Sequence, residues 1–330
     1  VLVTGSSQGI GFFAAREFCS RGALVIVTGR SPQKTERAAA EIAGGEGPSV
    51  AIPMTLDLSD FAGVRRFAQQ VRLQVEKLDI LVLNAGMSYP PNLARGSTTA
   101  ASGHDMLFAA NYLGHFLLVR QLLPSLAPGG TVVGVGSLSM WLASSSQLMH
   151  PNPRYDVWEP WRGPRPAYKN SKLALHCFLR TLRGRLRGRA RVVSMAPGRV
   201  ATAIQHGEEE KATKYVLWKW MGPPQEGGRL VFESAFSSLD PQPDMLYPYA
   251  FPRSYFDRYV PKAKEAWRIT NYKRFAYAAY LQRLTFGVLH ASVGPECTET
   301  FQENFWRWSA NATGLSADIE EQCEEERQLE

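Results

Sequence analysis

The sequence contains few cysteines. Its four thiols, Cys19, Cys177, Cys297 and Cys323, stand far apart, and they form neither a CxxC pair nor a Cys/His spacing of the kind that binds zinc. This pattern excludes zinc-finger and disulfide-dense classes of protein. It predicts reduced thiols in a reducing compartment, cytoplasmic or organellar, and it predicts no metal site.

A long apolar run is also missing. No stretch approaches the roughly 18 apolar residues that a membrane-spanning helix needs. The sequence opens on Val1, without a methionine or the charged segment of a signal peptide. We therefore expect a globular protein whose natural N-terminus is missing, with any targeting peptide or membrane anchor upstream of Val1. With 330 residues, 45% of them hydrophobic, the chain can bury a large core in one or two domains.

Acidic residues are outnumbered, since 37 Lys and Arg face 30 Asp and Glu, for a net charge of +7. Much of this charge is local. The stretch 180–192, "RTLRGRLRGRARV", holds six arginines, whereas the last 14 residues, 317–330, are strongly acidic. Because the arginine run follows a predicted helix and precedes an apolar strand, we interpret it as a solvated helix end and turn rather than a nucleic-acid site. The acidic end is expected to be a disordered or helical tail.

From residue 1 to about 200, short β-branched runs alternate with longer helical stretches. This alternation predicts an α/β fold, a doubly wound parallel sheet of the Rossmann type. Apolar residues at helical spacing from Phe61 to Val75, behind the cap candidate Ser59, predict that one crossover is a helix. The six strand candidates are "VLVTG" (1–5), "ALVIVTG" (23–29), "SVAIPMTLD" (49–57), "LDILVLNAG" (78–86), "TVVGVGS" (131–137) and "ARVVSMAPG" (190–198).

The segment "TGSSQGIG" follows the first strand and places Gly5, Gly9 and Gly11 at a strand-to-helix turn. Glycine permits a tight turn and a close approach of the backbone to a pyrophosphate, and the following helix offers unpaired N–H groups and its positive dipole end. The spacing departs from the G-x-G-x-x-G fingerprint, so a turn needed only for packing is the alternative. We predict a dinucleotide site here, with Ser7 and Ile10 among its contacts.

Further polar residues stand where later strands end. Arg30 follows the second strand, where NAD-binding proteins place a carboxylate for the 2′-hydroxyl, and a guanidinium there suits a 2′-phosphate. It therefore favours NADP(H), the alternative being an exposed arginine without a ligand. Asp57 is expected either to contact the adenine or to cap the next helix. Asn84, Ala85 and Gly86 end the fourth strand, at the edge where open α/β sheets bind ligands.

Four side chains are candidates for the chemistry. Asn111 lies inside an apolar helix, where a kink-stabilising water or a proton relay would satisfy its amide. Ser137 follows the fifth strand. Tyr168 and Lys172 are four residues apart and therefore share one helical face. The adjacent cation favours the phenolate, which makes the tyrosine a usable acid and base, although such a pair also arises by chance at helix rims.

Taken together, these motifs resemble the short-chain dehydrogenase/reductase superfamily, over residues 1 to about 203. The resemblance implies hydride transfer between a nicotinamide and a carbonyl or alcohol. Tyr168 would exchange the proton, Ser137 would hold the substrate oxygen, and Asn111 would support a water relay. Lys172 would bind the nicotinamide ribose and lower the pKa of the tyrosine. In "PGRVAT", the residues implied to line the nicotinamide end are Pro197, Gly198, Val200 and Thr202.

Within that superfamily, "NYLGHFLLVRQLLP" and "PAYKNSK" are similar to the subgroup of retinol dehydrogenases, WW-domain oxidoreductases and light-dependent protochlorophyllide reductases. "FWRWSANATGL" (305–315) is similar to a C-terminal element of several members. Two features depart from the superfamily's pattern. The 30 residues between Ser137 and Tyr168 exceed the usual spacing, and residues 204 to 300 match nothing that would identify a substrate.

The expected organisation is a dinucleotide-binding catalytic core (1–203), a substrate-binding C-terminal section of the same domain (204–316) and an acidic tail (317–330). "YPYAFPRSYFDRYVP" (247–261) is rich in aromatics and prolines. We interpret it as a lid over an apolar substrate, a retinoid, steroid or lipid aldehyde, with plain core as the alternative.

The leading hypothesis is an NADP(H)-dependent carbonyl or alcohol oxidoreductase that works without light. Light-driven reduction of a tetrapyrrole double bond and a non-catalytic NADP-binding scaffold are the alternatives. The expected partner is a small apolar substrate and not a nucleic acid. Peripheral membrane association and a homodimer are left open, as is the direction of the reaction.

Overall fold

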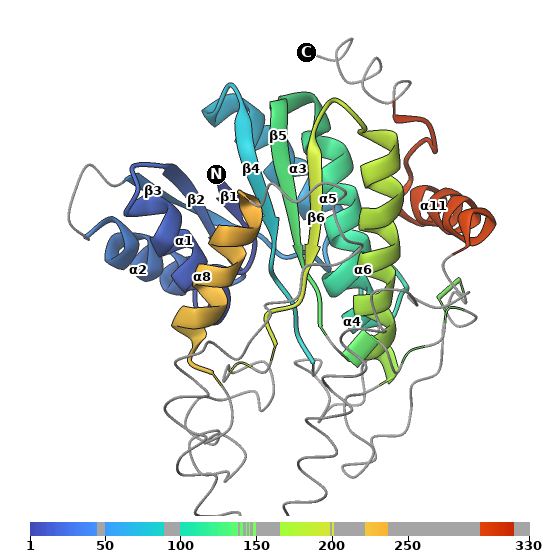
Figure 1. Ribbon diagram of the computed structural model, residues 1–330, viewed down its shortest axis with the longest axis horizontal. Helices are drawn as coiled ribbons and strands as arrows, with labels where there is room; N and C mark the ends of the chain where they lie inside the picture. Colours follow the sequence, from blue (N-terminus) through green and yellow to red (C-terminus); the bar gives the residue numbers. More distant parts are fainter. Residues whose placement is uncertain are drawn as a thin grey trace, which may run out of the picture.

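Figure 1 shows the computed structural model of the chain, with a parallel sheet at its centre. In the part of the chain that the structure describes, this sheet has six strands in the order β3-β2-β1-β4-β5-β6. This confirms the predicted doubly wound sheet. Each predicted stretch matches one strand, but the fifth strand begins at Leu126, five residues before its predicted stretch 131–137. The strands are β1 (Leu2–Val3), β2 (Leu24–Gly29), β3 (Val50–Thr55), β4 (Leu78–Leu83), β5 (Leu126–Val135) and β6 (Arg191–Met195). The described residues are 1–44, 50–88, 100–137, 139, 140, 143, 145, 148, 149, 166–198, 200, 222–236 and 298–319.

Helices cover both faces of the sheet because every crossover between parallel strands must return over one face. Helices α1, α2 and α8 lie on one face, and α3, α5 and α6 lie on the other (Figure 1). Helix α11 packs outside α5 and α6. The helices are α1 (Gly9–Cys19), α2 (Pro32–Ala43), α3 (Phe61–Gln74), α4 (Met106–Phe108), η2 (Ala109–Leu113), α5 (Gly114–Leu122), η3 (Leu123–Ser125), α6 (Pro166–Arg185), α8 (Pro224–Ala235) and α11 (Glu299–Thr313).

The strand order reverses between β1 and β4, because β2 lies on one side of β1 and β4 on the other. In open α/β sheets, ligands bind outside the carboxyl ends of the strands at such a switch point. The residues that follow β1, β2, β4, β5 and β6 therefore meet at one edge of the molecule. The polar motifs of the sequence stand at these positions.

The predicted crossover helix is confirmed as α3, but its start differs from the prediction. Asp60 is the N-cap residue, and the helix begins at Phe61. The assignment of Ser59 as the cap is wrong because Asp57 engages it first. The Oδ1 atom of Asp57 accepts hydrogen bonds from Ser59 N at 2.9 Å and Ser59 Oγ at 2.7 Å. The Asp57 carboxylate thus shapes the turn before α3 and does not cap that helix, so of its two proposed roles only the adenine contact stays a prediction.

Residues Met106–Ser125 form one continuous helical stretch that is long and apolar enough to cross a membrane. The expectation that no such run exists is therefore wrong by length and composition. Of its most apolar window, 89% is buried inside the protein, as expected of a core helix. Leu117, Leu118 and Val119 are fully buried there.

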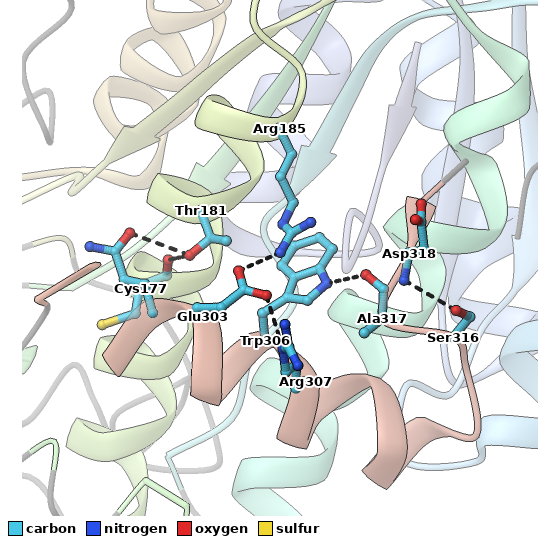
Figure 2. A network of polar contacts seen from close by, with 10 residues as sticks. Cys177, Thr181, Arg185, Glu303, Trp306, Arg307, Ser316, Ala317 and Asp318 are labelled. Atoms are coloured by element: carbon cyan, nitrogen blue, oxygen red, sulfur yellow. Dashed lines mark hydrogen bonds and ion pairs between the residues drawn. The ribbon is translucent and has the colours of Figure 1, made fainter. Parts of the chain in front are cut away.

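Helix α11 contains most of the "FWRWSANATGL" element and packs its aromatic face against the core. Trp306 lies 5.8 Å from the Phe178 ring, and its Nε1 donates to the carbonyl of Ala317 at 2.8 Å (Figure 2). Arg185 pairs with Glu303 at 2.5 Å and lies over the Trp306 ring. The predicted acidic tail starts at residue 317, and its first residue, Ala317, thus takes part in these contacts.

One cysteine departs from the expected reduced state. Cys177, fully buried in α6, is disulfide-bonded, so the expectation of four reduced thiols is wrong at this position. Cys19 is buried and forms no disulfide. Cys297 and Cys323 lie outside the described residues, as do the predicted lid at 247–261 and the nicotinamide-contact candidate Thr202.

Candidate active site

The glycine turn between β1 and α1 leaves no room for a side chain at Gly5 or Gly11. Gly5 has a φ of +64°, and a Cβ atom there would lie 2.8 Å from the Cα of Ala85. A Cβ atom on Gly11 would lie 2.3 Å from the Nδ2 of Asn84. These close approaches require glycine. The turn can therefore bring its backbone and the first N–H groups of α1 close to a phosphate.

Thr4 clamps the glycine turn to the end of β4. Its Oγ1 accepts hydrogen bonds from the backbone N–H groups of Asn84 at 2.9 Å and Ala85 at 3.0 Å. In return, Asn84 Nδ2 donates to the carbonyls of Thr4 at 2.9 Å and Gly5 at 3.1 Å. The sequence analysis singled out Asn84 and Ala85 but missed Thr4. A hydroxyl at the end of a buried strand was the signal available for it.

The candidate residues for the adenosine end gather beside β2. Arg30 is exposed directly after β2. A Cβ atom on Gly29 would lie 2.8 Å from the Ser7 Oγ, so Ser7 lies close beside this strand end. Leu56 N donates to the Gly29 carbonyl at 3.0 Å, which holds the segment of Asp57 alongside. Arg30, Ser7 and Asp57 therefore come from three separate segments that meet at this edge.

Asn111 lies in a π turn. In η2 the N–H of Gly114 bonds the carbonyl of Ala109, five residues back. The Asn111 amide is fully buried and donates from Nδ2 to Met87 O at 2.8 Å and to Ser171 Oγ at 3.0 Å. Its Oδ1 accepts from Met87 N at 2.8 Å. Protein groups thus bond both the amide nitrogen and the amide oxygen of this side chain, and its support of a water relay stays a prediction.

Ser171 joins the π turn to the start of α6. Besides accepting from Asn111, its Oγ donates to the carbonyl of Tyr168 at 2.8 Å. Ser139 has a similar place beside Ser137, because its Oγ lies 3.0 Å and its N lies 3.3 Å from the Ser137 Oγ. The sequence analysis missed both serines. Their spacing, three residues after Tyr168 and two after Ser137, was the only signal.

Ser137, Tyr168 and Lys172 come together at the end of β5. Lys172 is 2% exposed; its Nζ lies 5.9 Å from the Tyr168 ring centroid and donates to the carbonyl of Val135 at 2.9 Å. Burial lowers the pKa of Lys172 to about 8. Burial raises the pKa of the Tyr168 phenol, while a hydrogen bond with Ser137 lowers it. The lowering of the tyrosine pKa by Lys172 stays a prediction.

The segment after β6 approaches the glycine turn through α8. Gly198 has a φ of +77°, and Val200 forms an isolated parallel bridge with Gly222. A Cβ atom on Gly227 of α8 would lie 2.9 Å from the Cγ1 of Ile10 and 3.4 Å from the Cγ2 of Val200. Ile10 and Val200 therefore both lie against the first turn of α8 at Gly227. Gly9 starts α1 beside them, Pro197 precedes Gly198, and Gly86 follows the clamped Asn84 and Ala85.

The arrangement as a whole suits a dinucleotide and a proton transfer. The described residues provide a glycine-rich turn at a helix start and a cation at the end of β2. They also provide a tyrosine with a serine and a lysine at the end of β5. Among the described residues, no three His, Cys, Asp or Glu side chains gather as metal ligands would.

Comparison with known proteins gives consistent matches. The sequence model of the family described as short chain dehydrogenase matches residues 1–147. Human retinol dehydrogenase 12 is 34% identical over 228 residues, 68% of this chain and 67% of that protein. Mouse polyprenol dehydrogenase is 32% identical over 253 residues, 72% of each chain. Among solved structures, the Pseudomonas aeruginosa RhlG/NADP active-site complex is 27% identical with a TM-score of 0.54, covering 71% of this chain and 88% of that one.

Proposed function

The chain belongs to the short-chain dehydrogenase family and is an oxidoreductase acting on CH–OH or C=O groups with a nicotinamide cofactor, and from this premise we propose that it uses NADP(H) on an apolar carbonyl or alcohol. Tyr168 is the proposed acid and base. The observation that carries the proposal is the meeting of Ser137, Tyr168 and Lys172 at the end of β5.

The choice of NADP(H) rests on Arg30. Arg30 is exposed at the end of β2, directly after Gly29, which Ser7 approaches. A 2′-phosphate of a bound dinucleotide would lie at this strand end. RhlG, a structural neighbour, was solved with NADP. The glycine turn and the start of α1 would hold the pyrophosphate. Lys172 gives one of its N–H groups to Val135 O and would offer another to the nicotinamide ribose.

The proposed chemistry divides between cofactor and protein. NADPH, when bound, would supply the hydride that reduces the carbonyl carbon. Tyr168 would donate its phenolic proton to the carbonyl oxygen, and Ser137 would hold that oxygen by a hydrogen bond. Lys172 would stabilise the phenolate that remains. For an alcohol substrate the same groups act in reverse, with the tyrosine as base.

The proposed substrate is long and apolar. Retinol and polyprenol, after which two relatives are named, are both isoprenoid alcohols with a polar end and an apolar chain. This supports a retinoid or lipid alcohol or aldehyde over a small polar one. The expected contacts for the apolar chain lie in the section 204–316, of which the structure describes 222–236 and 298–316.

The test is turnover in darkness. The protein is incubated with NADPH and all-trans-retinal, a long-chain aliphatic aldehyde and a short aldehyde, and both NADPH loss and alcohol formation are measured. We expect equal amounts of both, with preference for the long substrates. NADPH binding without turnover on any aldehyde or alcohol would support the scaffold alternative, and turnover of protochlorophyllide only under light would support the tetrapyrrole alternative.

A further inference from the structure

A buried histidine bridges the glycine turn and the Asn111 segment. His115 lies in the first turn of α5 and is fully buried. Its Nδ1 is 3.0 Å from the backbone carbonyl oxygen of Asn111. Its Nε2 is 3.0 Å from the Oγ1 of Thr4, which lies 111 residues away in sequence. One imidazole therefore touches both the cofactor side and the catalytic side of the candidate site.

The surroundings of His115 determine its tautomer. A carbonyl oxygen can only accept, so Nδ1 carries the hydrogen and donates it to Asn111. Burial, the largest cause, lowers the pKa of His115 to about 4, with the charge of Lys172 lowering it further and the Asn111 bond opposing. The ring is therefore neutral near pH 7. Its Nε2 has a free lone pair and accepts the Thr4 hydroxyl hydrogen.

This assignment completes the bonding of Thr4. The Thr4 oxygen accepts two N–H groups, from Asn84 and Ala85, and a hydroxyl has two lone pairs for that purpose. Its single hydrogen has two acceptors within reach, His115 Nε2 at 3.0 Å and the Val82 carbonyl oxygen at 3.2 Å, and we assign it to the nearer His115. With the hydrogen donated to the imidazole, both lone pairs of Thr4 are aimed at the turn after β4. His115 thus sets the rotation of the hydroxyl that clamps the turn.

We propose that His115 is a positioning residue that holds the glycine turn and the Asn84–Gly86 turn in a fixed relation to the Asn111 carbonyl. It touches neither substrate nor cofactor and acts through Thr4 and Asn111. The effect on cofactor binding rests on the proposed function, whereas the effect on the Asn84 and Ala85 amides does not. A core-filling role predicts that an apolar ring of similar size would serve equally well.

The first test compares two buried histidines. His115→Phe keeps an aromatic ring and removes both hydrogen bonds. His176→Phe is the matched control, because His176 is also buried and neutral, with its Nδ1 3.0 Å from Ser194 Oγ in another part of the sheet. Hydrogen exchange is measured on peptides covering Leu83–Met87, together with NADPH affinity and the melting temperature.

Loss of one buried hydrogen bond corresponds to about tenfold in an equilibrium. We therefore expect His115→Phe to raise exchange of the Asn84 and Ala85 amides by about tenfold and to weaken NADPH binding by a similar factor. His176→Phe should leave both within about twofold of the parent, even at an equal loss of melting temperature. Equal effects of the two substitutions on this turn would show a core-filling role and overturn the proposal.

A second pair of variants separates the two bonds. His115→Asn can place an amide N–H where Nδ1 lies, and His115→Gln can place an amide oxygen where Nε2 lies. We expect the Gln variant to preserve exchange at Asn84 and Ala85 better than the Asn variant. In a Thr4→Val background, where no hydroxyl remains, His115→Phe should add less than about twofold to the exchange rate. Additive effects of the two substitutions would contradict the coupling.

These readouts distinguish the two proposals. If the parent protein binds no NADPH, the proposed function fails, while the exchange rates of Asn84 and Ala85 still decide the role of His115. If the parent binds NADPH and the His115 variants bind it equally well with unchanged exchange, the positioning role fails and the proposed function stands.

Discussion

The first turns of α6 carry Tyr168 and Lys172, which face the end of β5, whereas its last turns carry Phe178 and Arg185, which pack against α11. The first region places polar groups in a buried setting, where burial shifts the pKa of both residues. The second region is mainly aromatic, with Phe116, Phe178 and Trp306 in mutual contact. One helix therefore connects the candidate catalytic residues to an aromatic cluster that stabilises the fold. Substitutions in the two regions should give different kinds of loss.

The largest expected effect is on turnover, from Tyr168→Phe. The change keeps the ring but removes the proton donor, so kcat should fall by about 10² to 10⁴, while NADPH affinity and the melting temperature stay close to those of the parent. Steady-state kinetics with retinal and a thermal melt measure this.

The matched control is Tyr112→Phe, which removes another buried hydroxyl, bonded to Ser309 of α11 at 2.6 Å. It should lower stability by about 1 kcal/mol and leave kcat within about twofold of the parent. Near-parental turnover of the Tyr168 variant would show that Tyr168 is not the acid and base of the reaction.

The next effect is on stability, from Trp306→Ala. Trp306 is 2% exposed, stacks near Phe178 and donates to Ala317, so its loss opens a large cavity and leaves that carbonyl without its indole partner. The free energy of unfolding should fall by about 3–5 kcal/mol. Urea denaturation measures it, and the kcat of the folded fraction should change little. A large loss of kcat in fully folded Trp306→Ala protein would show that the packing at the end of α6 also affects catalysis at its start.

A smaller effect is expected on cofactor choice, from Arg30→Asp. Replacing attraction for the 2′-phosphate with repulsion should shift preference from NADPH toward NADH by about 1–3 kcal/mol. Binding titrations with both cofactors measure this. Arg37→Asp, the same charge change at an exposed position of α2, is the control and should shift preference little. Equal use of NADPH and NADH by the parent protein would contradict the assignment of Arg30.

The smallest effect is expected from Glu303→Gln, at the outer edge of the α11 region. Burial opposes the shift, but hydrogen bonds and charges of Arg307 and Arg185 hold the pKa of this carboxyl below its usual value. Because the group is partly exposed, the substitution should cost only about 0.5 kcal/mol at pH 7. The pKa of Glu303 is lower in the folded protein than in the unfolded chain. The ion pairs therefore stabilise the fold at pH values above the ordinary glutamate pKa, and this stabilisation is lost as the pH falls through the lowered pKa of the folded protein.

Urea denaturation of the parent and the Glu303 variant across this range measures the loss, and Glu36→Gln, an exposed change on α2, is the control. A difference between parent and variant that does not shrink on acidification would show that the ion pairs are not its source.

The fold was predictable from sequence because buried parallel strands appear as continuous apolar runs, as in "LDILVL" and "LVIVTG". The family resemblance was predictable from spacing, because Tyr168 and Lys172 are neighbours on a helix whatever the rest of the chain does. Helix starts were less predictable. Ser59 has the right side chain for a cap, yet Asp57 competes for it, and that competition is settled only by the turn itself.

Contacts between distant segments were not predictable. Thr4 and His115 are 111 residues apart, and Tyr112 and Ser309 are 197 apart, so their pairing depends on how the sheet and helices assemble. The spacing of residues within a short segment does not indicate contacts with a distant segment. The disulfide state of Cys177 was missed for the same reason, since neighbouring sequence contains no second cysteine.

The π turn at Ala109–Leu113 also limits how this chain can change in length. A π turn accommodates one more residue than a regular helical turn, and each residue rotates the helix by about 100°. Deleting a single residue there would restore a regular α-helix and swing every side chain before it by that angle relative to every side chain after it. If His115 kept its contact with Thr4, Asn111 would then no longer face Ser171. Tyr112 would likewise no longer face Ser309. Homologous chains should accordingly vary in residue identity at this turn far more readily than they gain or lose a position.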